Sequence, residues 1–216
     1  MYSSVTSEQL VLINRYTPAS MPPVEAEEVV SVTFIATDNL LTRSLGKWSE
    51  EDLDAIARLL PGLPFTLDHD WSDVAKSQGI VYDARVIRST TAPAGAMDRA
   101  GNSSQNQEIV KREGYITVEA DVAFPVTSPV LSGLKFGLIG NVSLGGFVYS
   151  DVLCPICKTS FDDKHCPHYV PDRGWGAESD ENVAPYFIRQ GVYDLGELSI
   201  VLIPNIPAAG VVKKSM

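Results

Sequence analysis

The chain contains 216 residues, of which 44% are hydrophobic and 20% charged. This length and composition are typical of one globular domain with its own core, and they exclude disorder for the main body of the chain. The formal net charge of −10 disfavours nucleic acids and anionic membranes as partners, because acidic surfaces repel phosphate. No apolar run reaches the length of a membrane helix and no secretory signal pattern opens the chain, so we expect a soluble, intracellular protein.

The N-terminal part of the chain holds a polar lead-in, one strand pattern and one helix pattern. Residues 1–27 mix Ser, Pro and Glu and predict an extended lead-in. The β-branched, apolar run of residues 28–37 predicts a buried strand. Ser49 suits a helix N-cap, apolar residues then recur at helical spacing, and Pro61-Gly62 ends the pattern. We therefore expect a helix between these points.

Strand patterns dominate the rest of the chain. Residues 90–107 are small, polar and punctuated by Gly and Pro, so they predict a loop in which the part after Pro93 can form a short helix. The predicted strands lie within residues 64–71 (a short strand running into a polar turn), 79–89, 114–125, 134–151 (a pair or one bent strand) and 196–211 (a strong strand, then a Pro-bounded turn). Because strands outnumber helices, we expect a β-rich α+β fold, a closed or partly closed β-barrel with a few flanking helices. This domain would span residues 28–212, with 213–216 as a C-terminal tail.

Three cysteines lie close together in the sequence, at Cys154, Cys157 and Cys166. An odd, clustered set of cysteines in an intracellular protein indicates a metal rather than disulfides. Zinc takes four soft or borderline ligands in a tetrahedron, so one histidine would complete the site. With four protein ligands there is no open position, and we expect structural Zn²⁺ rather than a catalytic ion. Three free cysteines in a loop are the alternative.

Two histidines compete for the fourth position of this site. We favour His168 over His165, because Pro167 helps to turn the chain so that His168 and the preceding cysteine converge. The ion would hold a loop insertion at about residues 152–185, which has too few apolar residues to hold itself.

His69 is the one histidine outside the cysteine cluster. It ends a short strand pattern and stands between Asp68 and Asp70. Two interpretations stay open: a surface turn residue stabilised by these acids, or a metal site with Asp68 and Asp70, although adjacent residues rarely converge on one ion.

Ser143 lies in the segment GNVSLGGF, where apolar residues flank it and two glycines follow. This pattern suits a nucleophile, because glycine lets a substrate backbone approach closely and lets backbone N–H groups turn toward a developing oxyanion. The N–H groups at Leu144, Gly145 and Gly146 are the candidates for that oxyanion hole. The alternative is an ordinary strand serine before a β-bulge.

Glu197 begins an apolar strand pattern, and by alternation it shares a face with Ser199 and Val201. A carboxylate in this position lies at a solvated sheet edge or points into a site, where it could orient an imidazole. The other candidates for this role are Asp68, Asp70, Asp151 and Asp194.

Three segments together resemble a known family. LPFTLDHD, GNVSLGGF and GELSIVLIPNIPAAGV occur in the order found in phage prohead (capsid maturation) serine proteases, which are similar in fold to the herpesvirus assemblins. They hold, in order, His69, Ser143-Leu144-Gly145-Gly146-Phe147, and Glu197-Leu198-Ser199-Ile200-Val201 with Pro204-Asn205 and Ala208. The resemblance covers roughly residues 28–212, and the pair of glycines before Phe147 departs from the commoner single glycine.

The resemblance implies a serine endopeptidase in the host cell cytoplasm, inside the assembling procapsid. It would cut scaffold and capsid proteins, and itself, with Ser143 as nucleophile, His69 as general base and Glu197 as the orienting acid. The resemblance also implies a possible homodimer. The predicted zinc-binding insertion resembles an additional segment found in some relatives.

Two other functions fit the sequence. A catalytically inactive, zinc-stabilised capsid assembly or scaffold component would keep the fold without reactivity at Ser143. A zinc hydrolase would lose activity at once on chelation, while Ser143→Ala would do little.

Overall fold

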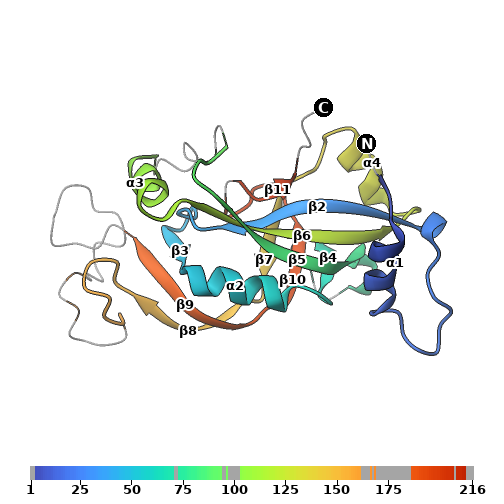
Figure 1. The fold of residues 1–216 in the computed structure, drawn as a ribbon, viewed down its shortest axis with the longest axis horizontal. Helices are drawn as coiled ribbons and strands as arrows, with labels where there is room; N and C mark the ends of the chain where they lie inside the picture. The colour runs from blue at the N-terminus through green and yellow to red at the C-terminus, as the bar shows by residue number, and fades with distance from the viewer. Residues whose placement is uncertain are drawn as a thin grey trace.

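The computed structural model describes residues 3–70, 73–93, 96, 103–161, 166, 168, 186–206 and 208–212, and it has a β-rich α+β fold with two sheets (Figure 1). The larger sheet has the strand order β1-β2-β6-β5-β4-β10-β7, and β11 also pairs with β2. Its strands are β1 (Ser3–Ser4), β2 (Val29–Asp38), β4 (Pro64–Leu67), β5 (Gly79–Ser89), β6 (Tyr115–Pro125), β7 (Val142–Gly145), β10 (Glu197–Ile200) and β11 (Gly210–Val211). The smaller sheet has the order β3-β9-β8 and consists of β3 (Gly46–Trp48), β8 (Val148–Leu153) and β9 (Phe187–Asp194).

The described residues also contain α-helices and short 3-10 helices. They are α1 (Ser7–Asn14), α2 (Glu50–Leu59), α3 (Ser103–Glu113) and α4 (Pro129–Lys135), with 3-10 turns at Ala26–Glu28 and Val74–Lys76. Over the part of the chain that the structure describes, no helix is long and apolar enough to cross a membrane.

The helix predicted after Ser49 is confirmed as α2. The Ser49 hydroxyl accepts a hydrogen bond from the Asp52 backbone N–H at 3.1 Å, which satisfies one of the free donors of the first turn. Leu53 and Ile56 are fully buried. After the helix, Gly62 adopts φ +96°, a backbone conformation that favours glycine. This helix packs on β9 of the smaller sheet and on β5 and β6 of the larger one, so it joins the two sheets.

The core beneath the candidate site is aromatic. The Phe65 ring on β4 lies 5.1 Å from the Phe34 ring and 5.0 Å from the Phe124 ring, centroid to centroid. All three rings are fully buried. Because side chains alternate along a strand, the next residue on β4, Thr66, points to the opposite face of the sheet.

The barrel prediction is wrong, because neither sheet closes on itself. β7 stands at the end of the strand order and is four residues long. Beside it, an isolated bridge joins Asn141 to Gly210, and the two-residue strand β11 pairs with Phe34 and Ile35 of β2. Contacts this short bring the ends of the sheet near each other without forming a continuous ladder.

The extended lead-in predicted for residues 1–27 is also wrong, because it contains α1. Thr6 and Gln9 form a capping box: the Thr6 hydroxyl accepts from the Gln9 N–H, and the Gln9 side chain accepts from the Thr6 N–H. The helix is held to the sheet by a hydrogen bond from Gln9 to the Tyr82 hydroxyl at 3.0 Å. The helical signal was therefore present at residues 6–9, before the Pro-rich stretch that dominates this region's composition.

The boundaries of several other predicted elements also differ from those in the structure. The loop predicted over residues 90–107 contains the start of α3, and the first two residues of the predicted strand pair at 134–151 belong to α4. The last strong strand pattern ends at Ile200 rather than continuing through the apolar residues that follow. The tail at 213–216 lies outside the described residues, as do residues 162–165, 167 and 169–185 of the predicted insertion.

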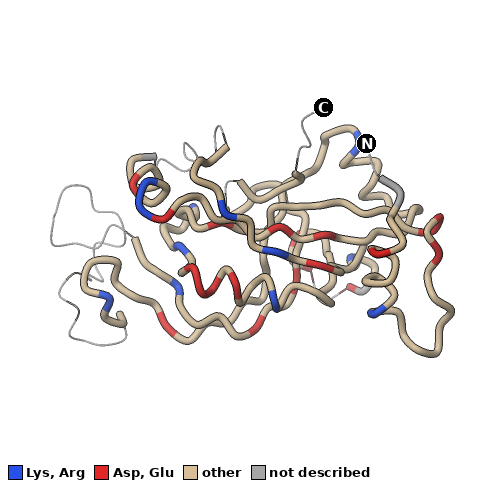
Figure 2. The backbone as a smooth tube through the Cα atoms, viewed as in Figure 1, with Lys and Arg blue, Asp and Glu red and all other residues tan. Residues whose placement is uncertain are grey.

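Figure 2 shows acidic residues along α2 and on the sheet beside it. Arg88 of β5 pairs with Glu50 at 3.0 Å, and Arg85 pairs with Glu119 at 2.7 Å and Asp121 at 2.6 Å. Such partly exposed pairs contribute little stability each.

Candidate active site and metal centre

His69 lies in a tight turn directly after β4. Asp68 and His69 both adopt left-handed backbone conformations, with φ of +54° and +56°. This region is uncommon for residues other than glycine, and such strained positions gather at functional sites. The turn is held to β10 by two hydrogen bonds: Asp68 N–H to the Ile200 carbonyl at 2.8 Å, and His69 N–H to the Ser199 hydroxyl at 2.9 Å. The chain therefore folds back over the face of β10.

Strand register creates a polar face around β10. This strand lies between β4, with which it is parallel, and β7, with which it is antiparallel. Residues opposite each other across neighbouring strands share a face. The residues that share the polar face are Thr66 on β4, Glu197 and Ser199 on β10, and Ser143 and Gly145 on β7. The opposite face carries apolar residues of the core, namely Phe65, Leu67, Val142, Leu144, Leu198 and Ile200.

Glu197 is buried on this polar face, with 1% of its surface exposed. One carboxylate oxygen, Oε1, lies 2.5 Å from His69 Nδ1, and the other, Oε2, accepts a hydrogen bond from the Thr66 hydroxyl. A buried carboxylate needs such partners, because leaving it unpaired is costly. With both oxygens engaged, the carboxylate has one orientation, and it holds the imidazole by its Nδ1 atom. His69 Nε2 is the ring nitrogen that remains for chemistry.

Gly145 explains why the imidazole and the carboxylate fit here. A Cβ atom at this position would lie 2.3 Å from Glu197 Oε1 and 2.7 Å from His69 Nδ1. The imidazole–carboxylate pair therefore rests directly on the backbone of β7, and any side chain would displace it. Gly146, the second glycine of the pair, has φ +63° and turns the chain from β7 toward β8.

Ser143 is the next residue on the same face of β7, about 6.6 Å along the strand from Gly145. Directly opposite it stands Ser199, whose hydroxyl accepts the His69 backbone N–H. Both anchors of His69 are therefore on β10: its backbone is held opposite Ser143, and its ring is held opposite Gly145. Within the described residues, no hydrogen bond joins Ser143 to His69, and the Ser143 hydroxyl makes a long 3.5 Å contact with the Leu144 carbonyl.

The other carboxylates considered for the third position differ in their surroundings. Asp151 Oδ1 accepts from the Ser160 hydroxyl at 2.5 Å, and Asp194 Oδ1 accepts from the Leu195 N–H at 2.9 Å. Asp68 and Asp70 flank the histidine in the turn itself. Of these groups and Glu197, it is Glu197 that the structure brings into contact with the imidazole.

Two residues of this site were missed by sequence reasoning. Thr66 and Ser199 support the acid and the histidine backbone, and neither was assigned a role from the sequence. The E-x-S alternation of β10 and the polar residue within an apolar β4 were the available signals. They become meaningful only when the two strands are known to be neighbours.

The predicted zinc ligands come together in the Cys3His cluster, formed by Cys154, Cys157, Cys166 and His168. Their ligand atoms all lie within 4.8 Å of one another. Cys157 Sγ and Cys166 Sγ are 3.7 Å apart, and Cys154 Sγ is 3.7 Å from His168 Nδ1. Bonds of about 2.3 Å to a tetrahedral zinc ion put sulfur atoms about 3.8 Å apart. These residues therefore fit a metal ion such as zinc. His165, the competing ligand, lies outside the described residues.

The first half of the cluster is a tight turn at the end of β8. The Cys154 N–H donates to the Thr159 carbonyl at 3.0 Å, and the Ile156 N–H donates to the Cys154 sulfur at 3.4 Å. Hydrogen bonding to Thr159 lowers the pKa of Cys157 to about 6, which favours the thiolate that binds metals. Burial raises the pKa of Cys166 to about 11, so that metal binding would release its proton.

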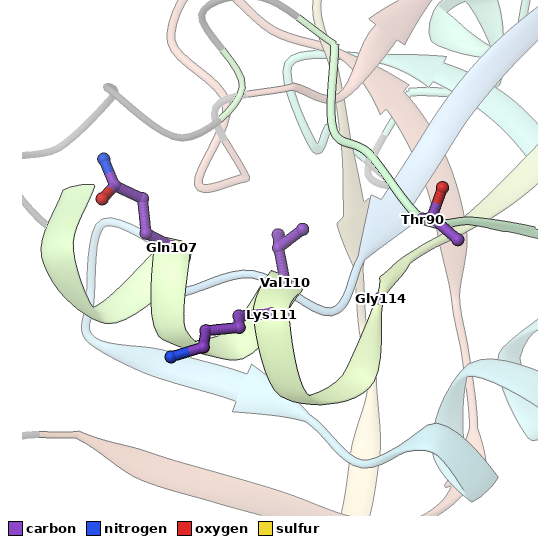
Figure 3. Close-up of a pocket in the computed structure, with 5 residues that line it drawn as sticks. All are labelled: Thr90, Gln107, Val110, Lys111 and Gly114. Atoms are coloured by element: carbon purple, nitrogen blue, oxygen red, sulfur yellow. The ribbon is translucent and has the colours of Figure 1, made fainter.

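A separate pocket of about 350 Å³ lies beside α3 (Figure 3). Gln107, Val110 and Lys111 project from the helix, and the pocket is also lined by Thr90, directly after β5, and by Gly114, between α3 and β6. None of these five residues is a carboxylate, cysteine or histidine, so the pocket offers no chemistry that compares with the polar face of β10.

No family model, no curated protein and no solved structure matches this chain. The resemblance to prohead proteases therefore stays a prediction. A functional assignment depends on the geometry of the His69–Glu197 pair, its relation to Ser143, and the Cys3His cluster.

Proposed function

We propose that the chain is a serine endopeptidase that processes scaffold or capsid protein, and itself, inside an assembling procapsid in the host cell. The observation that carries the proposal is the buried Glu197 carboxylate bonded to His69 Nδ1 on the same sheet face as Ser143. A nucleophile, a base and an acid that orients the base are the components of serine-dependent acyl transfer. The acidic net charge suits protein substrates better than nucleic acid.

The mechanism assigns one task to each group. Ser143 Oγ attacks the scissile carbonyl while His69 Nε2 takes the hydroxyl proton. The C–N bond then breaks, and the same proton leaves on the amine product. Water, deprotonated by His69, hydrolyses the acyl-enzyme and restores Ser143. Glu197 fixes the tautomer with the proton on Nδ1 and stabilises the imidazolium. N–H groups between Leu144 and Gly146 are the proposed oxyanion donors.

The proposed role of the metal is structural. Four protein ligands leave no open coordination position for water or substrate. Cys154, Cys157, Cys166 and His168 would hold the connection between β8 and β9, where few apolar side chains are available. The zinc hydrolase alternative needs a vacant position that this ligand set does not offer.

The direct test is co-expression with the cognate scaffold and capsid proteins, followed by intact-mass analysis. Wild type should generate new termini, and Ser143→Ala and His69→Ala should lose at least about 10³-fold in cleavage rate while remaining folded. Ser150→Ala is the matched control, because Ser150 is an exposed strand serine that bonds the Gln190 carbonyl. Cleavage by Ser143→Ala at the wild-type rate would overturn the assignment.

A catalytically inactive assembly component is the second candidate. It is favoured by one observation, the lack of a hydrogen bond between Ser143 and His69 within the described residues. Covalent labelling with a fluorophosphonate probe separates the two functions. An active protease should label at Ser143, whereas an inactive assembly protein should enter particles without labelling.

A further inference from the structure

Two large apolar side chains shortly after the end of β10 are exposed to solvent. Leu202 is 84% exposed and Ile203 is 74% exposed. A single exposed apolar residue is ordinary, but adjacent ones next to a candidate site suggest recognition of another molecule. Their neighbours on each side, Val201 and Pro204, are both buried. The exposure is therefore confined to this pair, which we call the apolar step.

The backbone of the apolar step is fixed. The Leu202 carbonyl accepts a hydrogen bond from the Asn141 side chain at 3.1 Å. The Pro204 carbonyl accepts from Arg43 Nε at 2.9 Å, and the Asn205 carbonyl accepts from the Arg43 N–H at 2.8 Å. These bonds hold the segment from both sides, so the two side chains are presented on a braced backbone.

The apolar step adjoins both halves of the candidate active site. On one side, Asn141 precedes Ser143 by two residues, and its carbonyl accepts from the Val201 N–H at 3.1 Å. On the other side, the turn that carries His69 is bonded to the carbonyl of Ile200, two residues before Leu202. A polypeptide whose scissile bond lies at Ser143 must pass close to this surface.

We propose that Leu202 and Ile203 bind a large aliphatic or aromatic side chain of the polypeptide substrate, close to the scissile bond. This inference rests on the endopeptidase function proposed above. Burial of an apolar side chain against this pair removes apolar surface of both molecules from water, and the braced backbone lowers the entropy cost of binding. A substrate fits better than a permanent partner, because a permanent partner here would obstruct the strand of Ser143.

Another large apolar side chain is exposed close in sequence to Asn141, the residue that binds the Leu202 carbonyl. Leu138 is 78% exposed and lies on the connection into β7, three residues before Asn141. A peptide bound beside Asn141 would therefore have a second exposed apolar side chain nearby.

The experiment uses peptides that span the cleavage site mapped by co-expression, with Leu or Ser at each flanking position. For wild type, kcat/KM should be at least about 10-fold higher with Leu than with Ser at one of these positions. The Leu202→Ser/Ile203→Ser double variant should lose most of this preference, mainly through KM, while fluorophosphonate labelling of Ser143 continues at the wild-type rate. Val11→Ser is the matched control, because Val11 is 61% exposed on the distant helix α1.

The possible outcomes distinguish failure of this inference from failure of the proposed endopeptidase function. If wild type cleaves and the double variant keeps the full preference, the apolar step is not the binding surface, although the protease assignment stands. If the double variant changes the sedimentation of the protein but not the preference, the surface joins copies of the chain, which also overturns the inference. If wild type neither cleaves nor labels, the proposed function and the inference both fail.

Discussion

The candidate active site and the Cys3His cluster are built in opposite ways. His69 and Glu197 are 128 residues apart in the chain, and strand register brings them together. Cys154 and His168 are 14 residues apart, and a local turn begins their cluster. A site built by register depends on every strand that sets its alignment, whereas a local site depends on its own ligands. The two regions should therefore fail independently when single residues are changed.

The two regions are nevertheless joined by the β8–β9 hairpin. Arg189 on β9 is paired with Val152, and its guanidinium lies 5.1 Å from the Trp48 ring and 5.6 Å from the Phe147 ring. Burial lowers the pKa of Arg189 from its usual value. Phe147 directly follows Gly146, so the hairpin leaves the large sheet at the candidate oxyanion segment. Because the hairpin connects the two regions, a mutation in one could disturb the other. We expect it not to, and the variants below test this.

The largest effect is expected from Gly145→Ala. The new Cβ would overlap the Glu197–His69 pair, and losing that orientation should lower kcat/KM for peptide cleavage by about 10³ or more. Zinc affinity should stay at the wild-type value. Gly140→Ala is the matched control, because its Cβ would meet only Val211 at an ordinary 3.7 Å. Equal activity of the two variants would mean that the imidazole–carboxylate pair has no part in catalysis.

Cys154→Ser should have the opposite effect: zinc binding should weaken, while the candidate active site stays intact. Structural zinc sites bind with about 10–16 kcal/mol in total, so losing one of four ligands should lower zinc affinity by on the order of 100-fold or more. Competition with a chromophoric chelator measures this affinity, and labelling of Ser143 should persist. The exposed neighbour Ile156→Ser is the control and should bind zinc normally. Unchanged affinity in Cys154→Ser would show that the metal, if bound, lies elsewhere.

A smaller effect is expected where α2 meets the hairpin. The buried Asp52 carboxylate accepts the Val192 N–H at 2.7 Å and the Ser49 hydroxyl at 2.6 Å. Asp52→Ala leaves the Val192 N–H without its acceptor and should lower the free energy of unfolding by about 1–3 kcal/mol. Urea denaturation measures the change, and Asp52→Asn, which keeps an acceptor, should lose less. If both variants lose the same free energy of unfolding, the stabilisation comes from the charge of Asp52 rather than from its hydrogen bond to Val192.

The smallest effect is expected from Ser199→Ala. It removes the acceptor for the His69 N–H, while the hydrogen bond between Glu197 and His69 Nδ1 stays in place and still orients the ring. We expect kcat to fall about 5-fold, corresponding to about 1 kcal/mol, with KM unchanged. Steady-state kinetics on a mapped peptide gives this split, with Ser150→Ala as the control. A change confined to KM would instead assign Ser199 to substrate binding.

The sequence predicted those elements whose signals are local. Ser49 and Pro61-Gly62 delimit α2 closely, and the alternation at residues 79–89 became β5. α1 was missed because a short capping box was outweighed by the composition around it. The run after Ile200 was predicted as strand because its residues are apolar, yet two of them are exposed. Hydropathy alone cannot separate a side chain that enters the core from one that is presented to solvent.

For the candidate site, the sequence by itself determined the residue types and, for the cysteines, the grouping. Thiolate spacing is a local property, so the Cys3His set followed from the chain order, with His168 joining it in the structure. The tertiary structure alone decided that Glu197 reaches His69, that Thr66 and Ser199 support the pair, and that Gly145 must lack a side chain. The physical reason is strand register: one residue of slip would turn Glu197 into the core and expose Leu198 in its place.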